Sequence, residues 1–493
     1  MQAAFNIMEN GGNAFDAAVG AVFTSMVSEY CLTGPGGGGA FLASPVNAEP
    51  ILFDFFVDTP HPQPEKELDF FSIIVDFGPS QQQFHIGQGS VAIPGNIAGL
   101  LKVHQRLGQI PLKAVLEPAV NAARDGIILN SSQGYLIKIL EPILTYSNGG
   151  KVIFSPNGKL LKKDDRFKNT RFADLLECLL AEGHMYFYEK DGAELILNTV
   201  GEKGLLTKEG LALYRVAERV PLKSDFRGKT IYTNPAPSAG GTLITFILQL
   251  LERSKTGTKS ELIDLIRAMQ ITSAARKEIS IDMNNEFQIS QLLEPRTFSH
   301  YLRLFDSGST PSQNEKDPVS RGATTHVSII DKHGNAASVT TTNGEGCGYI
   351  IPELGMMLNN MLGEEDLNPM GFHQWAHQRR LPTMISPTIV MGEKGVELVL
   401  GSGGSNRLRS AISQVILNLF TKKMDLEAAV HTSRIHLEGN VLHYEPGTIL
   451  EPSMDDIRLH PWDENNLFFG GVNAVSPSEA IGDPRRGGTG MIR

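Results

Sequence analysis

A β-hairpin predicted over residues 322–344 constrains the fold of this chain more than any other segment. In both of its runs apolar residues alternate with polar ones, as expected of strands that bury one face. Lys332-His333-Gly334 supplies the turn, with Gly334 suited to a left-handed conformation. Matching the two polar faces sets Thr324 across from Thr342, because a slip of one residue would move every side chain to the wrong face.

The polar face of the hairpin is unusually rich in hydroxyl groups. They come from Thr324, Ser328, Ser338, Thr340 and Thr342, and the imidazole of His326 joins them. The hairpin alone leaves two interpretations open. The simpler one is a ribbon whose hydroxyl face is exposed to solvent, and the other is a face that lines a functional site.

Composition and charge exclude several classes of protein. With 41% hydrophobic and 20% charged residues, the chain is neither a disordered protein nor a coiled coil. A net charge of −10 argues against nucleic acid as the main partner. The sequence contains no run of 18 apolar residues, so no membrane span is predicted. The three cysteines are too widely spaced for a disulfide framework or a metal cluster.

The amino-terminal residues predict helix from Met1 to about Tyr30, with no basic region followed by an apolar one. We therefore expect no secretory signal in this sequence. The compartment is left undetermined: cytoplasmic if the protein begins at Met1, open if further residues precede it.

Helix and strand signals alternate along the rest of the chain. Helices are predicted over 13–28, 114–125 and 242–251 and after 91–96, strands over 40–44, 51–56, 389–391 and 396–400, and mostly helix over 130–225 and 255–320. The last of these stretches ends in a polar segment, 307–321, that is expected to be exposed and that runs directly into the hairpin.

An exposed polar segment that leads into a strand beginning Thr-Thr has a chemical meaning. The hydroxyl of Thr324 can attack the carbonyl of Ala323 and move the acyl group from nitrogen to oxygen, and hydrolysis of the ester then cuts the chain. The small side chain of Ala323 leaves that carbonyl unhindered. The new α-amine of Thr324, with an ordinary pKa of about 7.7–8.0, can assist its own hydroxyl as a nucleophile.

Several short motifs follow one another in a recognisable order. They lie at residues 11–18, 34–39, 93–95, 237–241, 324–326, 358–360, 386–388 and 401–404. In this order and over nearly the whole length, the chain resembles the γ-glutamyltransferase (γ-glutamyltranspeptidase) family of N-terminal-nucleophile (Ntn) hydrolases.

The resemblance implies an α+β fold, a four-layer αββα sandwich of the Ntn-hydrolase type. It also implies cleavage between Ala323 and Thr324 into a large-subunit segment, 1–323, and a small-subunit segment, 324–493. We expect the two fragments to stay associated as one intertwined domain, and leave further homo-oligomerisation open. Neither an organic cofactor nor a metal is implied.

The same resemblance assigns catalytic roles to four residues. Thr324 matches the nucleophile, and Thr342 matches a second threonine that hydrogen-bonds to it. Gly404 and Ser405 fall where the family has two glycines whose backbone N–H groups form the oxyanion hole. A serine is compatible with this role because the donor belongs to the main chain, and such a donor stabilises the oxyanion by roughly 2.7–4 kcal/mol.

The expected substrate-binding residues depart from the family pattern. In Asp54-Phe-Phe-Val-Asp58 the place of the arginine that grips a glutamyl α-carboxylate is taken by Phe56, and a phenyl ring cannot replace that contact. Thr383 is the hydroxyl left where the family has paired serines. Gly344 replaces a family asparagine, although Asn343 is adjacent.

An acidic run, Glu364-Glu-Asp366, stands where the family has a glutamine or glutamate followed by two aspartates. Glu364, or one of its two neighbours, is the candidate to receive a substrate ammonium group. The alternative is that these carboxylates only solvate or cap a turn.

The sequence therefore predicts a self-cleaving amidohydrolase or acyltransferase that acts on a small-molecule γ-glutamyl or related acyl amide. Water or an amine acceptor would release the acyl group from Thr324. Two alternatives remain: an acylase of the cephalosporin or glutaryl type with the same nucleophile, and an inactive relative that serves as a binding protein. The loss of the arginine keeps the first of these open.

Overall fold

The computed structural model describes residues 1–61, 65–76, 81–254, 261–280, 288–309, 323–368, 371–450 and 457–492. The chain divides into two compact units. The first comprises Met1–Arg219 and Gly322–Leu381, and the second comprises Val220–Arg321 and Pro382–Arg493. Each unit thus contains chain from both sides of the Ala323–Thr324 bond. Among the described residues, no helix combines the length and apolar character needed to cross a membrane.

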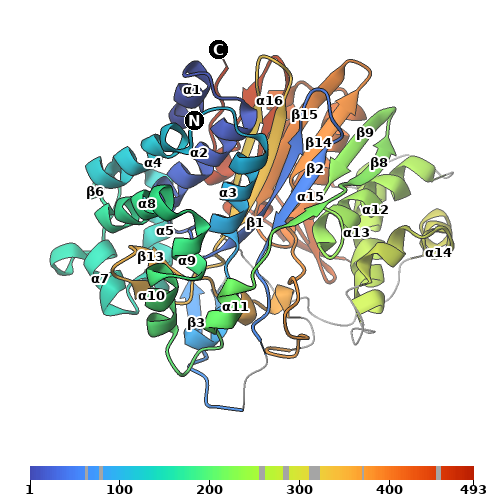
Figure 1. Cartoon of the computed structure of the whole chain (residues 1–493). Coiled ribbons are helices and arrows are strands. Elements are labelled where there is room, and N and C mark those ends of the chain that lie inside the picture. The colour runs from blue at the N-terminus through green and yellow to red at the C-terminus, as the bar shows by residue number, and fades with distance from the viewer. Residues whose placement is uncertain are drawn as a thin grey trace. The chain divides into compact units, whose positions relative to one another are not determined.

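The first unit is built on a five-stranded antiparallel sheet. Its order is β10 (Thr325–Ile330), β11 (Ala336–Thr342), β1 (Gly38–Ser44), β2 (Ile51–Phe55) and β7 (Ala217–Arg219). Helices α2 (Ala14–Ser28) and α3 (Asn96–Leu107) pack on this sheet (Figure 1). Because β1 and β2 pack their phenylalanines beneath these helices, the sheet is anchored in the largest apolar core of the molecule.

The helical pattern predicted from Met1 to about Tyr30 is two helices, and the second of them is the helix predicted over 13–28. α1 (Gln2–Glu9) ends before Gly11, whose φ of +90° cannot continue a helix. Asn13 then caps α2, accepting the backbone N–H of Asp16 while the Asp16 carboxylate accepts the N–H of Asn13. The continuous pattern from Met1 did not show this break, because alanines lie on both sides of it.

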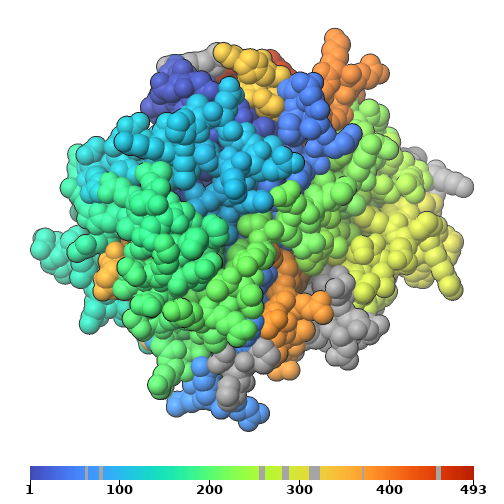
Figure 2. Space-filling model, in the orientation of Figure 1, coloured from blue at the N-terminus to red at the C-terminus, as the bar shows by residue number. Residues whose placement is uncertain are grey.

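A largely helical layer follows within the first unit. It contains α4 (Leu112–Asp125), α5 (Ser131–Ile139), α6 (Glu141–Leu144), α7 (Asn148–Phe154), α8 (Thr170–Glu182), α9 (His184–Tyr188), α10 (Asp191–Val200) and α11 (Lys208–Ala212). Figure 2 shows these residues, coloured cyan to green, as one continuous surface. The short strand pairs are β3 (Phe71–Asp76) with β4 (Gln81–Ile86), β5 (Ile127–Ile128) with β6 (Arg166–Phe167), and β12 (Ile350–Ile351) with β13 (Met356–Met357).

The second unit is built on a six-stranded antiparallel sheet. Its order is β20 (Ala480–Ile481), β19 (Gly471–Val475), β15 (Gly395–Gly403), β14 (Thr388–Gly392), β9 (Lys229–Thr233) and β8 (Leu222–Phe226). Helices α12 (Ala239–Arg253), α15 (Arg407–Phe420) and α16 (Leu426–His431) pack on it. Also in this unit are α13 (Glu261–Ser280), α14 (Pro295–Asp306) and a small sheet of β16 (Ile435–Glu438), β17 (Val441–Tyr444) and β18 (Arg458–Pro461).

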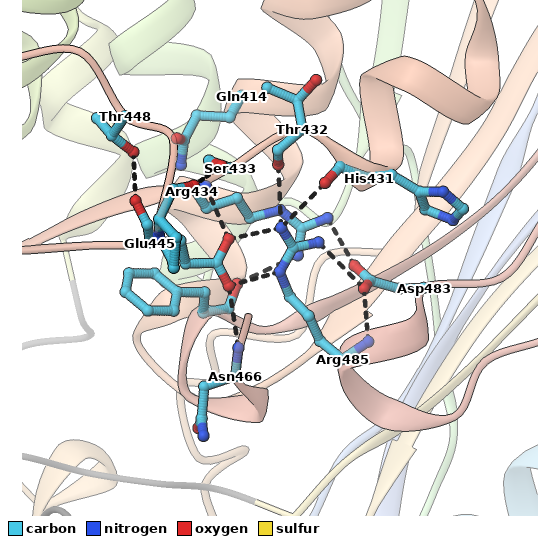
Figure 3. A network of polar contacts seen from close by, with 12 residues as sticks. Gln414, His431, Thr432, Ser433, Arg434, Glu445, Thr448, Asn466, Asp483 and Arg485 are labelled. Atoms are coloured by element: carbon cyan, nitrogen blue, oxygen red, sulfur yellow. Dashed lines mark hydrogen bonds and ion pairs between the residues drawn. The ribbon is translucent and has the colours of Figure 1, made fainter. Parts of the chain in front are cut away.

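A buried charge network fastens the carboxy-terminal residues of the second unit to the segment that leads into β16 (Figure 3). The guanidinium of Arg434 lies 2.6 Å from Asp483, and that of Arg485 lies 2.5 Å from Glu445 and 3.2 Å from Asp483. Further donors and acceptors come from Thr432, Val430 and Asn466. The charges are thus paired and hydrogen-bonded, which burial requires.

Candidate active site

The predicted register of the hairpin is confirmed. Val327 pairs with Val339 and His326 with Thr340, while Gly334 adopts a φ of +88° in the turn. The interpretation of an exposed ribbon is wrong, since every residue of β11 is buried. Extending the register past its last pair, Thr325 with Thr341, sets Thr324 across from Thr342.

In the uncut chain a side-chain hydroxyl group donates a hydrogen bond to the peptide group that precedes Thr324. The hydroxyl of Thr342 donates a hydrogen bond to the carbonyl oxygen of Ala323, which is the carbonyl that Thr324 would attack. The hydroxyl oxygen of Thr342 in turn accepts the backbone N–H of Gly344 at 3.0 Å. All three residues linked to this bond, Ala323, Thr324 and Thr342, are buried. The predicted bond between Thr342 and the Thr324 hydroxyl stays a prediction for the cut chain.

The glycine-rich motif at 34–39 explains how Thr342 is placed. Gly38 on β1 pairs with Thr342 on β11. A Cβ at Gly37 would lie 2.0 Å from the carbonyl oxygen of Thr342, so only glycine allows the two backbones this close approach. The carbonyl of Gly37 also accepts the N–H groups of Gly95 and Asn96, which joins the strand to the start of α3.

Two carboxyl groups lie beside Ala323 and Gly344, the residues that hydrogen-bond to the Thr342 hydroxyl. Glu345 accepts the backbone N–H of Ala323 at 3.2 Å, and the Oε1 atom of Glu364 lies so near Gly344 that a Cβ there would be 2.3 Å away. Burial, reinforced by the negative charges of Glu345 and Asp366, raises the pKa of Glu364 well above its usual range. Asn360 organises this region by accepting the N–H of Glu345 at 3.0 Å.

Gly344 is explained by its surroundings. Its φ is +58°, and a Cβ would lie 2.1 Å from Oδ1 of Asn360. An asparagine could adopt this conformation but would not fit the space. Asn343, the candidate beside it, donates through its side chain to the carbonyl of Met357 at 3.3 Å. Its role in substrate binding stays a prediction.

The other nucleophile or base candidates near the hairpin are poorly suited to catalysis. Both ring nitrogens of His326 are hydrogen-bonded, to Thr340 and Ser328 at 2.8 Å each, and burial lowers its pKa to about 3. His326 is therefore neutral at pH 7. Burial raises the pKa of the Cys347 thiol to about 12, so it is not a thiolate there.

Phe56 is buried just after β2, with its carbonyl accepting the hydroxyl of Tyr214 at 2.7 Å. Around it lies a charge cluster that sequence reasoning missed. Arg380 binds Asp58 at 2.7 Å and Asp54 at 3.0 Å. Arg380 follows the Ala323–Thr324 bond in the sequence. It thus belongs to an ion-pair network that stabilises the end of β2. Whether Phe56 meets substrate stays a prediction.

Gly404, Ser405 and Thr383 belong to the second unit. Gly404 and Ser405 connect β15 to α15 with φ values of +125° and +49°. Ser405 thus keeps a conformation that favours glycine. The hydroxyl of Thr383 accepts the N–H of Ile385 at 3.2 Å, and its carbonyl accepts the N–H of Ala239 at the start of α12. The catalytic and substrate-binding roles of these residues stay predictions.

Sequence reasoning predicted none of the contacts of Glu345 or Arg380, and it included Asn360 only as the last residue of the motif at 358–360. Their contacts join segments far apart in the chain, and periodicity carries no signal for them. Among the described residues there is no group of three or more histidine, cysteine, aspartate or glutamate side chains that could hold a metal ion.

Comparison with solved structures defines the class of the fold. The chain superposes on the cephalosporin acylase from Bacillus halodurans with a TM-score of 0.81, at 19% identity, over 99% of this chain and 93% of that one. A likeness at this identity shows the fold alone. The fold is that of an Ntn hydrolase, and the predicted α+β class is confirmed.

Comparison with known sequences then defines the family. A family model described as gamma-glutamyltranspeptidase matches residues 1–492. The glutathione hydrolase proenzyme of Escherichia coli (strain K12) is 30% identical, over 88% of this chain and 79% of its own. The acylase ACY 1 proenzyme of Pseudomonas sp. (strain SE83) is 28% identical, over 95% and 87%. This chain belongs to the γ-glutamyltranspeptidase family of enzymes.

Proposed function

We propose that this protein cuts its own chain before Thr324 and then uses that threonine to cleave γ-glutamyl or related acyl amides. The observation that carries the proposal is the hydrogen bond from the Thr342 hydroxyl to the carbonyl of Ala323. A carbonyl polarised at its oxygen is the more electrophilic, and the donor is already placed where negative charge develops.

The self-cleavage step follows from this geometry. The Thr324 hydroxyl adds to the Ala323 carbonyl carbon, and the oxyanion that forms is stabilised by Thr342. The C–N bond then breaks and the departing nitrogen takes up the proton that the hydroxyl has lost, which leaves an ester between the Ala323 carbonyl carbon and the Thr324 oxygen. Water hydrolyses the ester to the carboxylate of Ala323 and the free hydroxyl and amine of Thr324.

In the amide reaction Thr324 repeats this chemistry on a substrate. Its α-amine accepts the proton from the hydroxyl, the substrate carbonyl becomes an ester on Thr324, and the amine product leaves. Water or an acceptor amine then releases the acyl group. The proposed oxyanion donors of this step are the N–H groups of Gly404 and Ser405, a role supported by the family resemblance of their loop.

The acyl group is the open part of the proposal. The relative named as a glutathione hydrolase supports a γ-glutamyl group, whereas the relative named as an acylase supports the acylase alternative. Phe56 in place of the arginine favours the second, because a phenyl ring offers no charged contact to an α-carboxylate. Glu364 favours an acyl group that carries an amine, because a substrate ammonium group beside it would stabilise the charged carboxylate against the burial that raises its pKa.

Two substrates separate these cases. The purified protein is incubated with γ-glutamyl-p-nitroanilide and with glutaryl-p-nitroanilide, and Thr324→Ala serves as the blank. Turnover of the first alone supports the transferase, and turnover of the second alone supports the acylase. If the chain stays uncut and neither substrate is turned over, the proposal fails and the inactive relative is supported.

A further inference from the structure

We infer that Glu345 is a positioning residue for the self-cleavage. It holds the backbone N–H of Ala323 so that the carbonyl of Ala323 faces Thr342 and Thr324. The inference rests on the proposed function, since it concerns a step of that reaction. Glu345 is not among the residues that the family resemblance singles out. The assignment comes from its contact with Ala323 at 3.2 Å in the uncut chain.

The backbone ladder of the hairpin stops one residue short of the bond to be cut. Its last pair is Thr325 with Thr341. Beyond it, the N–H of Ala323 bonds to a side chain, that of Glu345, and its carbonyl bonds to the side chain of Thr342. Side chains have thus replaced the backbone partners that a continued antiparallel ladder would supply.

A turn after β11 brings Glu345 to this place. Gly344 has a φ of +58°, and Asn343 and Glu345 form an isolated bridge across it, so the chain curls back instead of continuing as a strand. The side chain of Asn360 fixes the turn by accepting the N–H groups of Glu345 and Gly346 at 3.0 and 3.2 Å. The carboxylate of Glu345 is thereby directed back to Ala323.

Two anchors on one residue determine how its carbonyl is turned. The backbone N–H of Ala323 is held by Glu345 and its carbonyl oxygen by Thr342. Rotation of the backbone is therefore restricted on both sides of the Ala323 Cα atom. Attack by Thr324 needs this orientation, because an approach that is misaligned by about 1 Å can cost on the order of 100-fold in rate. A carboxylate is a strong acceptor for such an N–H.

The test compares the first-order rate of chain cleavage in three variants, followed on denaturing gels. Glu345→Ala removes the acceptor, and we expect cleavage to slow on the order of 100-fold. Glu345→Gln keeps an acceptor oxygen and should stay within about tenfold of the unmodified chain. Glu353→Ala, an exposed glutamate on the same segment, is the matched control and should leave the rate unchanged.

Folding is checked separately, with Thr324→Ala present so that every chain remains uncut. Adding Glu345→Gln to this background should shift the thermal midpoint by no more than about 4 °C. The inference is overturned if Glu345→Ala cleaves at the unmodified rate, or if Glu345→Gln is as slow as Glu345→Ala. Cleavage of the unmodified chain with no effect at Glu345 leaves the proposed function standing, whereas an uncut unmodified chain removes both.

Discussion

At the scale of single residues, the Thr342 hydroxyl is the donor on which self-cleavage should depend most. Thr342→Val keeps the shape and removes the hydrogen bond to Ala323, so we expect cleavage to slow by roughly 10²–10³-fold, the effect of losing one oxyanion donor. Thr342→Ser retains the hydroxyl and is the control. The rate is read from gels, and equal rates for the valine and serine variants would contradict this role.

The second residue-scale prediction concerns Glu364. Because burial and the nearby negative charges raise its folded-state pKa well above the ordinary value of 4.5, the folded chain binds the proton more tightly than the unfolded chain. Its contribution to stability is therefore greatest below the unfolded pKa and is lost as the pH rises toward the folded one, by up to ~1.4 kcal/mol per pH unit.

Glu364→Gln should remove this loss. The stability of the variant relative to the chain that keeps Glu364 should therefore be higher at pH 7 than at pH 5. The measurement is the thermal midpoint at several pH values in chains carrying Thr324→Ala, with the exposed Glu353→Gln as control. An unchanged pH dependence would show that Glu364 titrates as an ordinary glutamate.

At the scale of elements, the charge network of Figure 3 holds β16, β17 and the carboxy-terminal residues together. Arg434→Met leaves Asp483 with one fewer cationic partner in a buried place, and we expect a loss of about 3–5 kcal/mol of unfolding free energy. Lys190→Met, which breaks an exposed pair with Glu182, should have little effect. Denaturant unfolding measures both, and similar losses would refute the structural role.

The elements also show what the sequence could and could not predict. The hairpin register was predictable because alternation fixes which face each residue takes, and the strand at 396–400 was predictable from its apolar run. The β3–β4 hairpin was not, since Gln81-Gln82-Gln83 has little strand propensity.

Within the candidate site, too, sequence patterns could not predict contacts that depend on the folded backbone. The order of motifs led to Thr324 and Thr342, whereas the contact of Glu345 with Ala323 depends on a turn at Gly344 that no periodicity reports. The φ of +58° there is a property of the folded backbone, and so is the packing of Asn360 against it.

At the scale of the whole molecule, the cut should not separate the fragments. β11 from the second fragment pairs with β1 from the first, and β14 pairs with β9 in the same way. These ladders lie in the cores of both units and do not involve the cut bond. Gel filtration without denaturant should give one species holding both fragments, and two separate peaks would contradict the account.

The most direct test of the central claim is the mass and amino-terminal sequence of the smaller fragment from purified protein. The account predicts a fragment of residues 324–493 that begins Thr-Thr-His from the unmodified chain and Ser-Thr-His from Thr324→Ser, and no such fragment from Thr324→Ala. A chain that stays intact, or that is cut at another bond, would contradict the assignment of Thr324 as the nucleophile.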